Sequence, residues 1–423
     1  MSRSLFQSVI HCSMSSPQRP PIWLDAALSS QSYMTTVLSV LSDRERKRGI
    51  ARNASRMRLF ERSDSSRQFP VILRGRRSSD APASHNEHYA IKTGSHPQHQ
   101  DLNRYTDIVP YDRTRVVVYD GCLGAGDDSK GKYLNASWVL ERMGGKWWIA
   151  TQAPVKRSAH AFLNALMQPI INPPYSASGR SRVRTVVQLT RDFEGGRRKA
   201  DAYFPSEVGE SIVIYPDDDL WGHPLKVTLC RQRTIEEAHC IESTVSILPI
   251  VNGSTTSGDI HSSVYEEHPI TFKHLLYLSW PDHGVPENHQ SVLSFIRLVD
   301  QTNRATSSGT RMSSYSSRRA SQEIDLDPPI MVGCSAGVGR TGSFIALTSL
   351  LRGYGFLPPT EQPSPSSVLP SSPLGPLPEI LQVDGVTQEI DSLREQRPGM
   401  VQRPEQVLLV YKVLAGALSW QLI

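Results

Sequence analysis

The pattern of hydrophobic and polar positions predicts alternating strands and helices after about residue 101. Short apolar or alternating runs typical of strands occur at 132–138, 148–154, 183–190, 272–278 and 328–332. Apolar residues at helical spacing occur at 160–168, 292–299, 341–353 and 407–418. Gly144 and Gly145 separate the first two strand-like runs, as a tight turn requires. The pattern therefore predicts a folded body over residues 101–423.

Residues 1–100 do not show this alternation of strands and helices. Residues 1–25 resemble a disordered tail. The alternative is a mitochondrial transit peptide, because the first 24 residues contain no acidic residue and include Arg3, Arg19 and six serines. Residues 26–100 are expected to form one amphipathic helix and a connecting loop. The apolar positions of this helix are Leu28, Met34, Val37, Leu38 and Leu41. We interpret the charge run at 43–48 as a solvated helix end, with a localisation signal as the alternative.

Three polar stretches interrupt the folded body and are predicted to be disordered insertions. They lie at about 253–263, 303–327 and 357–378, and the last contains eight prolines. Whether Ser321, Ser364 or Ser372 is phosphorylated stays open, because short kinase motifs occur often by chance.

Composition limits the partners of the chain. The 423 residues carry a net charge of +5 with dispersed Lys and Arg, which does not favour nucleic-acid binding. The five cysteines are odd in number and lack metal-type spacing, so we expect a reducing, cytoplasmic setting. No apolar run approaches the ~18 residues that a membrane span needs, so no membrane partner is expected.

Candidate chemistry concentrates in residues 331–344, MVGCSAGVGRTGSF, between a predicted strand and a predicted helix. After Cys334 come small, uncharged residues and then Arg340. The small residues are Ser335, Ala336, Gly337, Val338 and Gly339. Their backbone N–H groups and the helix N-terminus suit a phosphate dianion, and Arg340 can hold two of its oxygens. The same positive field favours the thiolate of Cys334 beneath the phosphorus.

The stretch CSAGVGRTG resembles the phosphate-binding loop of the tyrosine-specific protein phosphatases. One departure is Gly333, where that family usually carries a His that helps to orient the loop. The resemblance covers roughly residues 101–418. It implies an α/β fold with a single domain, a highly twisted mixed β-sheet flanked by helices, and the phosphate-binding loop between a strand and a helix.

A second matching segment is DLNRYTDIVPYDRTRVVVY, residues 101–119. It resembles the phosphotyrosine-recognition loop of the family. The resemblance implies that Tyr105 stacks on the phenyl ring of the substrate and sets the depth of the cleft. Asp107 matches the position that accepts hydrogen bonds from the substrate backbone. A deep cleft would let phosphotyrosine reach Cys334 while phosphoserine falls short.

The third matching segment is SWPDHGVPE, residues 279–287. A loop of Trp, Pro and Gly can swing as a rigid flap about its ends. Asp282 on this flap is the candidate general acid, because protonation of a tyrosyl oxygen eases its departure from phosphorus.

Two further loops complete the resemblance. Residues 194–199, EGGRRK, match the glutamate loop, in which Glu194 would align Arg340 and Lys199 would give support. Gln402 and Gln406 resemble the glutamine loop that positions the attacking water. The usual Thr after the first Gln is Arg403 here, followed by Pro404.

The resemblance implies metal-free and cofactor-free hydrolysis of phosphotyrosine in proteins. Cys334 would attack phosphorus, Asp282 would protonate the leaving group, and water placed by Gln402 would release phosphate from the cysteinyl phosphate. Thr341 would donate a hydrogen bond to the departing thiolate. Two alternatives are a catalytically silent phosphotyrosine-binding module and a dual-specificity phosphatase. The oligomeric state and the physiological substrate stay open.

Overall fold

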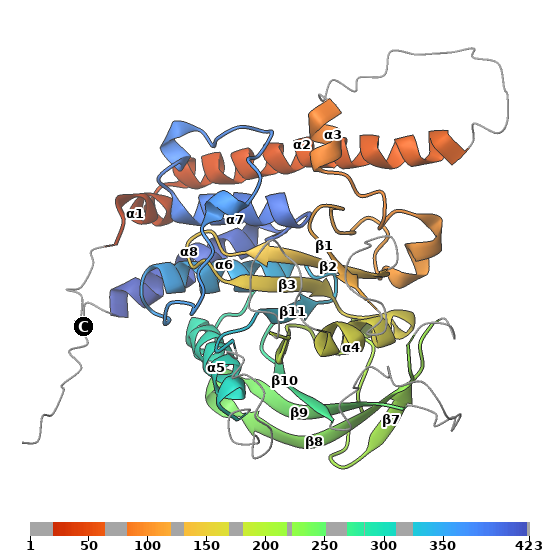
Figure 1. Ribbon diagram of the computed structural model, residues 1–423. Helices are drawn as coiled ribbons and strands as arrows, with labels where there is room; N and C mark the ends of the chain where they lie inside the picture. The colour runs from red at the N-terminus through yellow and green to blue at the C-terminus, as the bar shows by residue number, and fades with distance from the viewer. Residues whose placement is uncertain are drawn as a thin grey trace, which may run out of the picture.

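The computed structural model describes residues 20–63, 83–119, 131–168, 181–217, 222–250, 269–282, 284–309 and 325–420. Within these ranges most residues belong to one large sheet and the helices that cover it (Figure 1).

The sheet has nine strands in the order β1-β2-β3-β11-β4-β10-β9-β8-β7. The strands are β1 Arg115–Val118, β2 Lys132–Leu140, β3 Trp147–Gln152, β4 Thr185–Gln188, β7 Ser211–Ile214, β8 Leu225–Ile235, β9 Cys240–Pro249, β10 Ile270–Tyr277 and β11 Ile330–Cys334. A separate hairpin consists of β5, Phe193–Glu194, and β6, Arg197–Arg198. Strands β3, β11, β4 and β10 run parallel, while the outer strands pair antiparallel. The mixed sheet expected from the family resemblance is confirmed.

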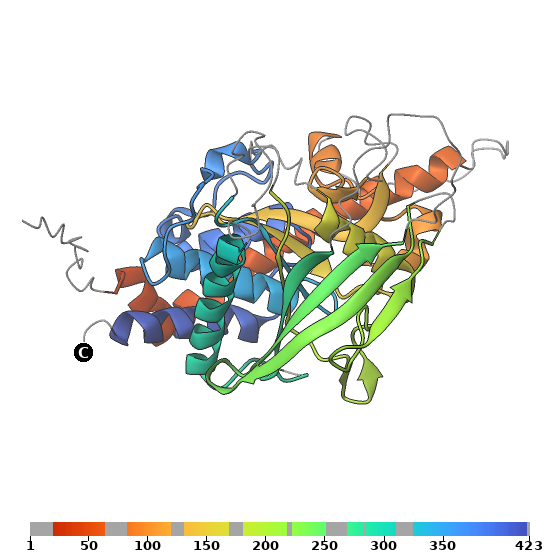
Figure 2. The same ribbon diagram turned by 60° about the horizontal axis from the view of Figure 1, so that its bottom comes forward.

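Helices cover both faces of the sheet (Figures 1 and 2). The helices are α1 Ile22–Ser29, α2 Gln31–Ser63, α3 Ala83–His88, α4 Ala159–Met167, α5 His289–Gly309, α6 Gly339–Gly353, α7 Gly385–Gln396 and α8 Pro404–Trp420. One hydrophobic cluster joins α1, α2, α5, α6, α7 and α8 to one face, and a second cluster includes α4 on the other. Among the described residues, no helix combines the length and apolarity needed to cross a bilayer.

Each strand and helix predicted from the sequence after residue 101 is confirmed. The predicted strands correspond to β2, β3, β4, β10 and β11, and the predicted helices to α4, α5, α6 and α8. The run at 183–190 contains β4, which lies between β11 and β10 in the parallel centre of the sheet. The turn between β2 and β3 has Gly145 at φ +70°, a conformation that glycine adopts without steric cost. Central strand β11 is buried along its full length, so the loop that follows it is rigidly anchored.

The N-terminal predictions need two corrections. The predicted tail overlaps α1, in which Leu24 is fully buried, so the folded part begins before residue 26. The charge run is the middle of α2 and not a solvated helix end. Arg44 and Arg48 are buried, because they pair with Asp391 on α7 and, for Arg48, also with Glu395. Burial of an arginine is tolerated only with such partners.

The predicted insertions also differ from the structure. Residues 357–378 are ordered against α2 and α7: the Arg44 guanidinium donates to the carbonyls of Leu374 and Gly375, and Leu377 is buried. We call residues 357–378 the proline-rich strap; these contacts hold it in one conformation. Residues 303–309 form the end of α5, where buried Asn303 donates to Asp327. The stretch 253–263 lies outside the described residues.

Candidate active site

The phosphate-binding loop lies where the sequence pattern placed it, between β11 and α6. Cys334 ends β11 and is 5% exposed. Gly337 has φ +72°, and a Cβ on it would lie 2.2 Å from the carbonyl oxygen of Thr151. Only glycine therefore fits here. The loop leads directly into the N-terminus of α6, which begins at Gly339 and favours an anion.

Arg340 is held in place by several oxygen atoms. Its Nη1 and Nη2 donate to the two carboxylate oxygens of Glu194 at 2.7 and 2.8 Å. Nη1 also donates to the carbonyl of Leu189 at 3.0 Å, and Nη2 to that of Pro281 at 2.8 Å. The structure thus brings together the predicted arginine and glutamate.

The Arg340–Glu194 pair shifts the titration of both groups. Burial opposes the charged form of each, but their mutual hydrogen bonds prevail: the pKa of Glu194 is lowered and the pKa of Arg340 is raised. Glu194 also accepts from the hydroxyl of Thr190 and the backbone N–H of Arg191. The carboxylate therefore stays charged and keeps the guanidinium fork in one orientation.

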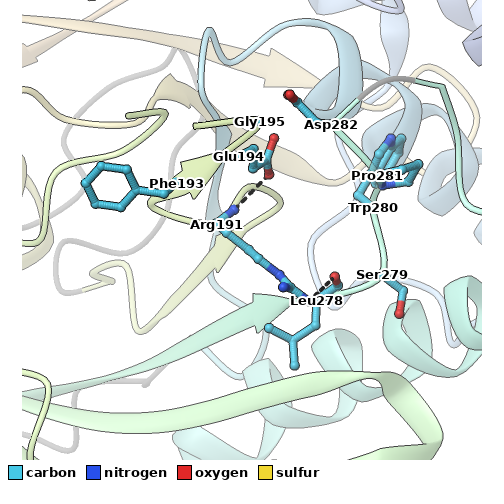
Figure 3. Close-up of a pocket in the computed structure, with 9 residues that line it drawn as sticks. All are labelled: Arg191, Phe193, Glu194, Gly195, Leu278, Ser279, Trp280, Pro281 and Asp282. Carbon is cyan, nitrogen blue, oxygen red and sulfur yellow. Dashed lines mark hydrogen bonds between the residues drawn. The ribbon is translucent and has the colours of Figure 1, made fainter. Parts of the chain in front are cut away.

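The flap that carries Asp282 lies against the glutamate loop. Lys199 Nζ is 2.9 Å from Asp282 Oδ1. In Figure 3 the carboxylate of Asp282 projects from the flap toward Gly195, where an added Cβ would lie 2.4 Å from Asp282 Oδ2. Behind the contact is a pocket of about 440 Å³ lined by residues of both loops, among them Arg191, whose guanidinium donates to Leu278 O. Since Arg340 of the phosphate loop also donates to the carbonyl of Pro281, the flap stands close to the phosphate loop as well.

A pocket of about 310 Å³ opens above Cys334. The predicted site residues that line it are Tyr105, Asp107, Glu194, Lys199, Asp282, Cys334, Ser335, Ala336, Gly339, Arg340, Gln402 and Gln406. The hydroxyls of Tyr105 and Ser335 are 2.9 Å apart, and that of Ser335 donates to the carbonyl of Lys199. Tyr105, 37% exposed, therefore forms one wall of the opening.

Three predicted residues lie behind the pocket instead of lining it. Gly337 and Val338 shape the loop, and the carbonyl of Val338 accepts from Gly342 N–H and Val401 N–H. Thr341 is fully buried, and its Oγ1 has no hydrogen-bond partner among the described residues. A buried hydroxyl without a partner is costly.

The glutamine loop enters the pocket from the start of α8. Gln406 Oε1 accepts from the backbone N–H of Arg403 at 3.1 Å, which closes the loop. Pro404 is the first residue of α8, a position where its missing N–H costs nothing. Arg403 lines the mouth of the pocket beside Gln402, and its half-exposed side chain pairs with Glu405 at 3.6 Å.

Arg397 supports the phosphate loop from below, a role that was not predicted from the sequence. It is fully buried under the phosphate loop, and burial lowers its pKa to about 10. Its Nε donates to the carbonyl of Gly337 at 2.8 Å, and its Nη2 donates to those of Ala336 and of the Asn135 side chain. By binding these carbonyls, Arg397 leaves the loop N–H groups facing the pocket.

Gly333, the departure from the family pattern, has no room for a side chain. A Cβ at this position would lie 2.7 Å from the carbonyl oxygen and 3.2 Å from Cγ2 of Thr151 on neighbouring β3. The residue before the nucleophile therefore contributes only backbone to the site.

Comparison with known proteins places this site in a family. A family model described as protein-tyrosine phosphatase matches residues 99–354. Human tyrosine-protein phosphatase non-receptor type 12 is 27% identical over 337 residues, which are 79% of this chain and 32% of that protein. The rat non-receptor type 20 enzyme is 27% identical over 335 residues, 78% of this chain and 57% of its own length.

Tyrosine-protein phosphatase 99A of Drosophila melanogaster is 26% identical over 357 residues, 84% of this chain and 20% of that protein. The chain thus spans less than two thirds of the length of each of these relatives. The family model covers more than half of the chain, and the matched range includes all the residues that line the pocket around Cys334 except Gln402, Arg403 and Gln406. This chain belongs to the protein-tyrosine phosphatase family.

Proposed function

We propose that the chain is a protein-tyrosine phosphatase that hydrolyses phosphotyrosine in proteins through a cysteinyl-phosphate intermediate. The observation that carries the proposal is the pocket that contains Cys334 at its floor, Arg340 at its side and Asp282 on the flap. A phosphoryl group bound in this pocket would be surrounded by the nucleophile Cys334, the oxyanion-binding Arg340 and the general acid Asp282.

In the first step Cys334 Sγ attacks phosphorus, and the bond from phosphorus to the tyrosyl oxygen breaks. Charge accumulates on the equatorial oxygens, where the loop N–H groups and the Arg340 fork stabilise it. The contacts of Arg340 with Glu194 and Leu189 support this role, because a fixed fork needs no reorganisation as the charge develops.

Asp282 donates a proton to the departing tyrosyl oxygen, a contribution of about 10²–10⁴-fold in rate. The contact of its carboxylate with Lys199 keeps it over the pocket. In the second step a water placed by Gln402 and Gln406 attacks the phosphocysteine, Asp282 takes the proton of that water, and the sulfur leaves as a thiolate. Thr341 Oγ1 donates a hydrogen bond to that thiolate.

The substrates that fit this pocket are phosphotyrosine residues of proteins. Tyr105 at the rim gives a flat surface for the phenyl ring, and Asp107 beside it offers a carboxylate to the substrate backbone. The pocket depth then selects a long aryl ester over phosphoserine or phosphothreonine. We place the enzyme in the cytoplasm, where phosphotyrosine proteins in signal transduction occur.

The test is phosphate release from a phosphotyrosine peptide and from the same peptide with phosphothreonine, both with a chelator present. Release from the phosphotyrosine peptide alone is the expected result. Equal rates on both peptides would indicate a dual-specificity enzyme instead. Binding without release would indicate a silent phosphotyrosine-binding module.

The matched variant is Cys334→Ser, which keeps the shape of the loop and removes the thiolate. We expect no turnover and retained binding of the phosphopeptide, measured by calorimetry. Hydrolysis by the purified variant above the uncatalysed rate would refute Cys334 as the nucleophile.

A further inference from the structure

A half-buried polar side chain, that of Gln188, lies directly beside the residue that precedes the nucleophile. Gly333 on β11 pairs with Gln188 on β4, and registered neighbours in a parallel sheet project to the same face. Since Gly333 has no room for a side chain, the polar group at this level of the sheet is the half-buried amide of Gln188.

Both ends of this amide are engaged. His274, on neighbouring β10 and 3% exposed, has its Nε2 3.1 Å from Gln188 Oε1. On the other end, Gln188 Nε2 donates to the carbonyl of Thr190 at 2.8 Å and to Asp192 Oδ1 at 3.3 Å. The amide therefore links β10 to the turn at residues 189–192.

This turn supplies the groups that orient Arg340. The carbonyl of Leu189 accepts from Arg340 Nη1. Thr190 Oγ1 and the backbone N–H of Arg191 both donate to Glu194 Oε1, and Glu194 in turn pairs with the guanidinium. Two ligands of Arg340, the carbonyl of Leu189 and the carboxylate of Glu194, are thus held by the turn to which Gln188 is hydrogen-bonded.

We propose that Gln188, anchored by His274, is a positioning residue that fixes the 189–192 turn and thereby sets the orientation of Arg340 toward the bound oxyanion. Gln188 itself does not line the pocket above Cys334. The inference rests on the proposed phosphatase function, because it assigns Arg340 the role of gripping phosphate.

The direct test measures binding of tungstate, a tetrahedral oxyanion, by calorimetry in the full chain. Gln188→Met keeps the length of the side chain and removes the amide. We expect tungstate affinity to fall about tenfold and kcat/KM on a phosphotyrosine peptide to fall by a similar factor. The rate of alkylation of Cys334 by neutral iodoacetamide should stay unchanged, since the change acts on the arginine side.

Gln168 offers the matched control. It is also half-buried, and its amide accepts from Tyr119 N–H and donates to the carbonyl of Val117. None of these three residues lines the pocket above Cys334. Gln168→Met should leave tungstate affinity at the wild-type value. Equal losses in the two variants, or tungstate affinity within twofold of wild type in folded Gln188→Met, would overturn the inference.

A second variant guards against misfolding of the first. Gln188→Glu preserves size and the acceptor for His274, but a carboxylate cannot donate to the carbonyl of Thr190. We expect the same loss at neutral pH and a smaller loss, relative to wild type, as the pH falls and the new carboxyl becomes protonated. A loss that does not change with pH would contradict the donor role.

Failure of the proposed function would look different from failure of this inference. A wild-type chain that neither binds tungstate nor hydrolyses the peptide would refute the phosphatase assignment. A wild-type chain that does both, with a Gln188→Met variant that matches it, would refute only the role of Gln188.

Discussion

The amino group of Lys199 lies 2.9 Å from Asp282 Oδ1, so the glutamate loop and the flap meet directly over the pocket. Arg340 adds a second link, because its Nη2 donates to Glu194 on one loop and to the carbonyl of Pro281 on the other. The position of the flap and the orientation of the Arg340 guanidinium are therefore coupled through the same two loops.

The first prediction concerns Asp282 as the proton donor. Asp282→Ala should lower kcat by about 10²–10⁴-fold on phenyl phosphate and far less on esters whose leaving groups have low pKa, since these need no proton. Steady-state kinetics across a series of substituted phenyl phosphates measures the dependence. An equal loss for every leaving group would contradict the acid role.

Lys199→Met provides the companion variant. It removes the contact with Asp282 and retains the carboxyl group, so we expect a smaller loss of kcat with the same preference for good leaving groups. A loss confined to KM would show that Lys199 binds substrate and does not position the flap.

Arg397→Met is predicted to destabilise the fold and to disorder the phosphate loop. The change leaves the carbonyls of Gly337 and Ala336 and the Asn135 side chain without their shared donor in a fully buried place. Loss of such a donor costs about 1–3 kcal/mol per group in general. Urea unfolding should report the loss of stability, and phosphatase activity should fall with it.

The outcome that would contradict this role is a variant with wild-type activity at temperatures where it is fully folded. Arg397→Lys is the conservative control. It retains the charge but not the planar fork, so it should recover part of the stability and little of the loop geometry.

Much of the site could be predicted because its residues are sequence neighbours. Cys334 and Arg340 lie in one loop, so their approach follows from local geometry alone. The pairing of Glu194 with Arg340 joins distant segments and followed only from the resemblance. The contact of Tyr105 with Ser335 also joins distant segments and was not predicted. Arg397 was assigned no role because nothing local shows that its side chain lies beneath Gly337.

The sequence was least informative where polar residues are buried by distant partners. Arg44 and Arg48 occur in a run that looks solvated, yet they contact acidic residues more than 300 positions later on α7. The proline-rich strap looked mobile for the same reason, since Arg44 binds its backbone carbonyls. Charge and proline content describe local preference, and tertiary partners decided the outcome here.

Gly333→Ala tests the close contact between β11 and β3. The new Cβ would meet the carbonyl oxygen of Thr151, so the strands must separate at the nucleophile. We expect a loss of about 1–3 kcal/mol in stability, as for overpacked cores, measured by urea unfolding. Gly333→His should cost at least as much and should change the pH profile of iodoacetate inactivation. Unchanged stability in both variants would show that the strand pair has room.

The last prediction concerns stability and pH. Burial lowers the pKa of His274 to about 4, from about 6.5 in the unfolded chain. Between these values the unfolded chain binds more protons than the folded one, so stability falls as the pH falls from 6.5 to 4. The full loss from this residue is about 3 kcal/mol.

His274→Gln should remove this loss while keeping an amide in reach of Gln188. We therefore expect the variant to be less dependent on pH than wild type between pH 7 and 4, measured as free energy of unfolding in urea at a series of pH values. His96→Gln, a change at an exposed site, serves as the control and should reproduce the wild-type curve. Parallel curves for His274→Gln and wild type would mean that His274 is protonated in the fold, and hence that water reaches this level of the sheet.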